Sequence, residues 1–311
     1  MGSLAGHVLP GLAFVIMGLW HLFNHIKLHS LGPNFYTSTP WFPTSKSRYL
    51  ELYFIMVGTS ISVSMELFIG PAKHHPFDVD GTIPSNHLRN VEHSLISMSF
   101  FVYAAFAIVL DKIKPKAQRA NLTQLVGAIA FSQQLLLFYL HSTDHKGLEG
   151  QYHLFLQLLV AISLTTTLMG IGMPASFMVS FVRSFSILFQ GLWFIVMGYM
   201  LWTPALIPKG CRLHSDDGHK IVSCASEEAL HRAKSLVNIQ FSWFFIGITV
   251  FVVSFYLALV GIYSPQVEYS PLGKEPKDIH EEFNDINTYE SKRFSEGEKG
   301  FAPFSLERLS G

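Results

Sequence analysis

Residues 238–263 read NIQFSWFFIGITVFVVSFYLALVGIY, and none of these 26 residues carries a charge. The hydrocarbon core of a bilayer is about 30 Å thick, and a helix of ~20 apolar residues crosses it. The stretch is too long and too continuous for a β-strand. It therefore predicts a transmembrane helix.

Six further apolar stretches of similar length precede this one, with proline and glycine residues between them. The expected spans are 8–28, 50–70, 91–111, 121–141, 153–173, 181–202 and 238–263. The sequence thus predicts an all-α fold, a seven-transmembrane-helix bundle over residues 1–263. Residues 264–311 combine Pro, Gly, Ser and mixed charges without apolar periodicity, which predicts a disordered cytosolic tail.

The composition agrees with a membrane protein. Hydrophobic residues make up 49% of the chain and charged residues only 14%, against ~25% charged residues in an average soluble domain. The 22 basic and 22 acidic residues cancel, so nothing suggests a surface for nucleic acid. The partner that the sequence predicts is the lipid bilayer.

The basic residues of the loops predict an orientation, because cytoplasmic loops are enriched in Lys and Arg. With the N-terminus outside, three cytoplasmic loops carry eight basic residues, and two short outer loops carry three. The outer loop 203–237 adds five basic residues and holds Cys211 and Cys224, either as free thiols or as a disulfide that needs an oxidising compartment. We expect a lumenal or external N-terminus and a cytosolic C-terminus, in an endomembrane or the plasma membrane.

Five of the predicted spans carry an ionisable residue near their outer ends. Such groups are costly near hydrocarbon unless they are paired or hydrated, so they indicate a functional site. The candidate residues are His7, Glu66, His93, His141 and His153.

Histidine and carboxylate ligands suit Zn or Fe, and histidine also titrates close to neutral pH. The sequence therefore predicts an outward-facing site that binds a transition metal or senses protons, in a protein that is not an enzyme. Three alternatives stay open. They are a metal-dependent membrane hydrolase or reductase, a trafficking scaffold without a site, and a small-solute or ion carrier with a path through Gln134, Gln190 and Gln240 to Glu51.

Other polar residues within the spans are predicted to be structural. Glu51 and Arg183, at the cytosolic ends of their helices, are expected to form a salt bridge or to snorkel. His21 and His25 share one helix face, but the sequence lacks the Glu of a His-Glu-x-x-His zinc motif. Glycines within the spans, among them Gly18, Gly191 and Gly198, predict close helix packing.

Several short motifs together resemble the transmembrane protein 45 family, in its plant branch. The motifs are Gly6-His7-Val-Leu-Pro-Gly11, Glu66, Asn90-Val-Glu-His93-Ser94, Phe138-Tyr-Leu-His141, Glu149, His153 and Phe189-Gln-Gly-Leu-Trp193-Phe. The resemblance covers residues 1–263 and implies a seven-helix membrane protein of unestablished activity. It adds weight to the five candidate site residues, whereas His21 and His145 depart from the family pattern.

Overall fold

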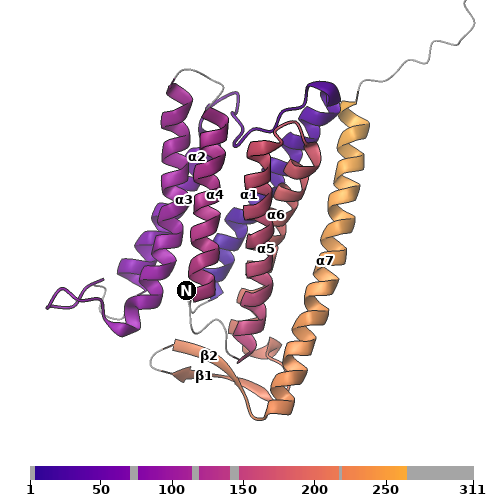
Figure 1. The fold of residues 1–311 in the computed structure, drawn as a ribbon. Coiled ribbons are helices and arrows are strands. Elements are labelled where there is room, and N and C mark those ends of the chain that lie inside the picture. Colours follow the sequence, from indigo (N-terminus) through magenta and orange to yellow (C-terminus); the bar gives the residue numbers. More distant parts are fainter. Residues whose placement is uncertain (1–3, 71–75, 114–118, 141–146, 217–218, 265–311) are drawn as a thin grey trace, which may run out of the picture. The chain divides into compact units, whose positions relative to one another are not determined.

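The computed structural model describes residues 4–70, 76–113, 119–140, 147–216 and 219–264. Within these ranges seven helices are long and apolar enough to cross a membrane, which confirms the predicted seven-helix fold of a multi-pass membrane protein (Figure 1). Beyond Ser264, the predicted disordered tail lies outside the described residues.

The helices follow one another around a bundle. Helix α1 packs on α6, α6 on α5, α5 on α4, α4 on α3 and α3 on α2, while α7 contacts α1 and α5. Their bounds are Leu4–Leu31 for α1, Leu50–Ser64 for α2, Leu88–Lys112 for α3, Arg119–Leu140 for α4, Gly147–Gly172 for α5, Phe177–Trp202 for α6 and Glu227–Tyr263 for α7.

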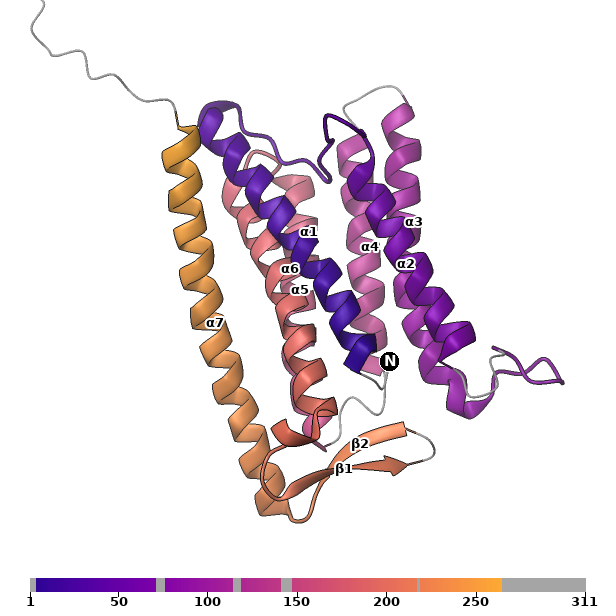
Figure 2. The same cartoon turned by 180° about the vertical axis from the view of Figure 1, so that it is seen from behind.

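The closest helix pair is α1 with α6, and Figure 2 shows α1 lying across α6. Glycines make this contact possible, as the sequence predicted. A Cβ atom on Gly18 would lie 2.5 Å from Leu188 Cα, and one on Gly191 would lie 2.5 Å from Val15 N. The two backbones are therefore in direct contact, as in other membrane helix pairs that pack through small residues.

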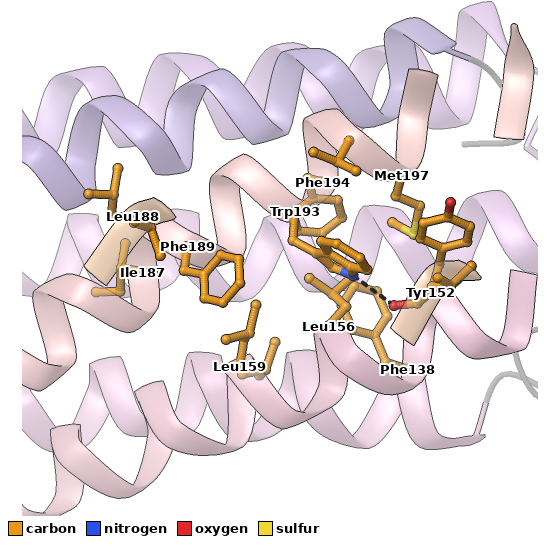
Figure 3. Packing of buried hydrophobic residues seen from close by; sticks show 14 of the residues in the cluster. Phe138, Tyr152, Leu156, Leu159, Ile187, Leu188, Phe189, Trp193, Phe194 and Met197 are labelled. Atoms are coloured by element: carbon orange, nitrogen blue, oxygen red, sulfur yellow. Dashed lines mark hydrogen bonds between the residues drawn. The ribbon is translucent and has the colours of Figure 1, made fainter. Parts of the chain in front are cut away.

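The main hydrophobic core lies between α5, α6 and α7. Trp193 is fully buried, and its indole Nε1 donates a 3.0 Å hydrogen bond to the carbonyl of Tyr152 (Figure 3). Phe241 of α7 stacks on Phe155 of α5 and Phe189 of α6, at centroid distances of 4.2 and 5.0 Å. These aromatic contacts hold α7 against the rest of the bundle.

The structure corrects the prediction for residues 203–237, which the sequence analysis treated as a loop. A hairpin forms there, with β1 at Cys211–Asp216 and β2 at His219–Cys224, and a disulfide joins Cys211 to Cys224. Helix α7 then begins at Glu227 rather than at residue 238. The Ser226 side chain accepts a hydrogen bond from Ala229 N, and this N-cap starts the helix in polar sequence, before the apolar stretch.

The described bundle has two distinct ends. The hairpin end holds the start of α1 and the β1–β2 hairpin (Figure 1). The opposite end holds the connection between α1 and α2, and we call its segment Tyr36–Phe42 the strap. The strap has no helix or strand, yet Tyr36, Ser38, Trp41 and Phe42 are buried.

Candidate functional site

At the hairpin end, two of the predicted site residues lie side by side. The rings of His7 from α1 and His153 from α5 have centroids 6.3 Å apart, and only 5% and 7% of these residues are exposed. Trp202 stacks on His7 at 4.3 Å, and Phe138 contacts His153 at 6.4 Å. Both imidazoles are therefore enclosed by aromatic rings.

Two further predicted residues form a second pair, on the other side of the bundle. Glu66 lies in the π-helical turn Met65–Ile69 that ends α2, a kind of turn often found at functional sites. Its Oε2 accepts a 2.8 Å hydrogen bond from Asn90 Nδ2 and lies 3.9 Å from His93 Nδ1. The π turn thus faces the start of α3.

The fifth predicted residue, His141, lies outside the described residues, as does His145. Among the described residues, no group of three or more His, Cys, Asp or Glu side chains is placed to hold a metal ion. The structure thus brings the predicted residues together as two pairs. Metal binding stays a prediction that depends on residues outside the described ranges.

A second polar cluster, at the strap end, was not predicted as a site. Glu51 is buried, and its two oxygens accept three hydrogen bonds. Oε2 accepts from Trp20 Nε1 at 2.9 Å and from Phe42 N at 2.8 Å, and Oε1 lies 2.8 Å from His21 Nε2. The carboxylate therefore joins α1, α2 and the strap.

Arg183 of α6 is the buried cation of this cluster, and 4% of it is exposed. Its Nη1 donates to Gln124 Oε1 at 2.6 Å, and its Nη2 donates to His25 Nε2 and to Thr39 O, both at 3.2 Å. The sequence predicted that Glu51 and Arg183 would form a salt bridge or snorkel. Instead each is buried and bonded to a histidine, so the cluster holds one carboxylate, one guanidinium and two imidazoles.

Hydrogen bonds from several residues of the strap join it to the helices around it. Tyr36 Oη lies 2.8 Å from His25 Nδ1, and Ser38 N donates to Pro174 O at 2.7 Å. Pro40 O accepts from Tyr103 Oη of α3 at 3.0 Å. Burial raises the pKa of Tyr36, so this phenol keeps its proton at neutral pH. The strap thereby closes one end of the bundle and bridges α1, α3 and α6.

Aromatic side chains occupy the interior between the two ends. Phe14, midway between His7 and His21 along α1, contacts Phe100 at 5.8 Å, and Phe100 contacts Phe131 at 5.4 Å. The polar path predicted for a carrier stays a prediction. Gln134 and Gln190 are buried within the bundle, whereas Gln240 accepts a hydrogen bond from Tyr152 at the contact of α5 and α7.

One sequence signal could have identified the strap-end cluster, although we interpreted it as structural. His21, His25 and Glu51 are ionisable residues within predicted spans, which by default suggests function. The hydrogen bonds from Phe42 N and to Thr39 O come from the backbone of the strap, and a backbone group has no signature in the sequence.

Residues 120–257 match a family described as "Family of unknown function (DUF716)", the family that includes proteins like transmembrane protein 45. The matched region runs from the start of α4 into α7. It contains Gln124, His153 and Arg183, and it ends six residues before the end of α7 at Tyr263. Helices α1 to α3 lie outside it.

Proposed function

We propose that this membrane protein senses protons through the imidazoles at the hairpin end, His7, His93 and His153. The proximity of His7 and His153 carries the proposal, since two imidazolium ions 6.3 Å apart repel each other within an aromatic enclosure. Histidine titrates between about pH 5 and 8, so a modest acidification changes the charge of the pair. The extra charge then biases the packing of α1 against α5 and α6.

The Glu66–His93 pair supports the same function. A proton on His93 would convert a 3.9 Å contact with the Glu66 carboxylate into an ion pair. Acidification would thus draw α2 and α3 together while it strains the contact between His7 and His153. Opposite responses in the two halves of the bundle give a means of converting pH into a change of shape.

Trp202 provides a test, because it stacks on His7 at 4.3 Å. A positive charge over an indole face perturbs its excited state, so we expect tryptophan emission of the purified protein to fall between pH 7.5 and 5.5. His7→Phe keeps the stacking and should abolish the part of this response that comes from Trp202, which is the part that Trp202→Phe also removes. Trp243→Phe is the matched control, because Trp243 is largely exposed and its loss should leave the pH response in place. A response of Trp202 that survives His7→Phe would contradict the proposal.

Measuring the metal content of the same preparations shows whether the ligand of this site is a metal ion or a proton. Zinc or iron bound in stoichiometric amount, and lost in His93→Ala and His153→Ala, would make the site a metal site completed by residues outside the described ranges. Equal metal content in the wild type and both variants would reject metal binding.

We also propose that the hairpin end faces the lumen or exterior and that the C-terminus is cytosolic. The Cys211–Cys224 disulfide supports this orientation, since disulfides persist in oxidising compartments. The basic loops support it as well. We further propose that residues 1–263 belong to the transmembrane protein 45 family. We also propose that the protein resides in an endomembrane or the plasma membrane.

The orientation can be tested with epitope tags at the two termini. In cells whose plasma membrane is selectively permeabilised, we expect a C-terminal tag to be stained by antibody. An N-terminal tag should then stain only on the cell surface or after internal membranes are also opened. The reverse pattern would overturn the proposed orientation. A mobility shift on reduction that Cys211→Ser abolishes would report the disulfide in the same samples.

A further inference from the structure

The two histidines at the strap end are one helical turn apart, yet their hydrogen bonds give them different proton capacities. His25 Nε2 lies 3.2 Å from Arg183 Nη2, which can only donate. His25 Nε2 must therefore accept, and the proton of the neutral ring must sit on Nδ1, which donates to Tyr36 Oη. Both nitrogens of His25 are engaged, and a second proton would oppose the Arg183 cation.

His21 has the opposite arrangement. Its Nε2 lies 2.8 Å from the Glu51 carboxylate, which can only accept, so Nε2 carries the proton and Nδ1 keeps a lone pair. Nδ1 is buried and has no hydrogen-bond partner among the described residues. This basic nitrogen accepts no hydrogen bond from any described residue, and its ring already faces a carboxylate. Nδ1 is therefore suited to take up a proton.

We propose that His21 and Glu51 form a second proton-binding site, at the strap end, which takes up one proton and thereby loosens the strap. This proposal stands independently of proton sensing at the hairpin end. The ligand is a proton delivered from the aqueous side next to the strap.

The charge balance of the cluster explains the coupling. Before uptake, the Glu51 carboxylate and the Arg183 guanidinium cancel, and both histidines are neutral. The other titratable groups of this cluster in the described chain are His25 from α1, which contacts His21, Tyr36 from the strap, which is bonded to His25, and Tyr103 from α3, which is bonded to the strap at Pro40 O. None of these three compensates an added proton, so uptake leaves one uncompensated positive charge in a buried site.

A buried net charge is costly, and admitting water relieves the cost. The strap is the part of the enclosure that can give way, because it has no helix or strand of its own and Glu51 holds its backbone at Phe42 N. A carboxyl group that shares the extra proton is also a weaker acceptor for Trp20 and Phe42 than a carboxylate. Proton uptake therefore weakens the bonds that hold the strap closed.

Hydrogen–deuterium exchange of the full-length protein in lipid nanodiscs tests this inference. The readout is the exchange of the backbone amides of strap residues 36–39, 41 and 42 at pH 5.5 and 7.5, corrected for the intrinsic dependence of exchange on pH. In the wild type we expect protection to fall on the order of tenfold at pH 5.5, because the open strap binds the proton more strongly than the closed strap does. Equal protection at the two pH values would overturn the proposal.

Two substitutions distinguish proton binding from a merely structural role. His21→Gln keeps an amide donor for Glu51 but removes the titratable base, so the strap should stay closed at both pH values. Glu51→Gln imitates the proton-loaded carboxyl group, so the strap should be open at both. If the cluster were only structural, His21→Gln would loosen the strap or leave its pH response intact. Either result refutes the inference, and His21→Gln decides the matter should Glu51→Gln fail to accumulate.

Asp111→Asn provides the matched control. This carboxylate also lies at the strap end, but its main partner, Arg48, is well exposed. We expect Asp111→Asn to leave the pH response of the strap unchanged. His7→Phe should leave it unchanged as well, so failure of the strap-end site and failure of the hairpin-end sensor give different results.

Discussion

Gly191→Leu should prevent this protein from accumulating in folded form, and Gly18→Leu should do the same. A Cβ at Gly191 would lie 2.5 Å from Val15 N and 2.6 Å from Gly11 O, and a Cβ at Gly18 would lie 2.5 Å from Leu188 Cα. All of these neighbours are backbone atoms, which cannot move aside by changing rotamer. Helices α1 and α6 would have to separate along the largest interface of the bundle.

The expected cost exceeds the ~1–3 kcal/mol of ordinary overpacking, because a whole helix must shift rather than a side chain. Size-exclusion chromatography of a fluorescent fusion in detergent measures the folded fraction, and thermal unfolding measures the stability of what remains. Gly58→Leu is the matched control. Gly58 is also a glycine within a membrane span, but a Cβ there would meet nothing within 4 Å. Equal yields of Gly191→Leu and Gly58→Leu would show that the α1–α6 contact does not determine folding.

The sequence predicted the spans well because membrane thickness sets the length of an apolar helix. It predicted the wrong start for α7, since the first turns, which contain Glu227 and Glu228, are polar and begin at a capping serine. Hydropathy marks where a helix enters the bilayer, whereas capping and tertiary contacts determine where the helix itself begins. The β1–β2 hairpin escaped prediction within the same polar stretch.

The sequence placed His7, Glu66, His93 and His153 near one face of the membrane. It could predict only the depth of each residue in the membrane. Which of them meet depends on the rotation of each helix and on the order of helices around the bundle. Because of that order, His7 lies next to α5 and α6, whereas Glu66 lies next to α3. Depth alone therefore predicted one site where the described structure has two pairs.

The strap-end cluster depends even more on tertiary structure. His21 departs from the family pattern, and Glu51 and Arg183 had a plain structural explanation as residues near helix ends. The structure changes that interpretation because the strap turns inward and covers them. Irregular backbone is tolerated at such a place only when it is buried in protein or lines water. No pattern of apolar residues in the sequence predicts that the strap turns inward.

Arg183→Met is the second substitution for which we expect a large effect. Methionine fills similar space without a charge, so Gln124 Oε1, His25 Nε2 and Thr39 O lose their shared donor. The Glu51 carboxylate also loses the cation that balances it. A buried acceptor left without its donor costs about 1–3 kcal/mol, and with three such acceptors we expect the free energy of unfolding to fall by about 3 kcal/mol or more. Arg48→Met is the control, because Arg48 forms an exposed ion pair with Asp111 and should matter little.

Acidification should stabilise the Arg183→Met variant. Without Arg183 the buried cluster carries one negative charge, and the folded state binds a proton at His21 and Glu51 more strongly than the unfolded chain does. Stability is then gained as the pH falls, so acidification should restore part of what Arg183→Met removes. Adding Glu51→Gln should restore it at every pH, because the second substitution removes the unbalanced carboxylate. Thermal unfolding of the four variants of this cycle at pH 5.5 and 7.5 measures the coupling. Additive losses at both pH values would mean that Glu51 and Arg183 do not balance each other across the cluster.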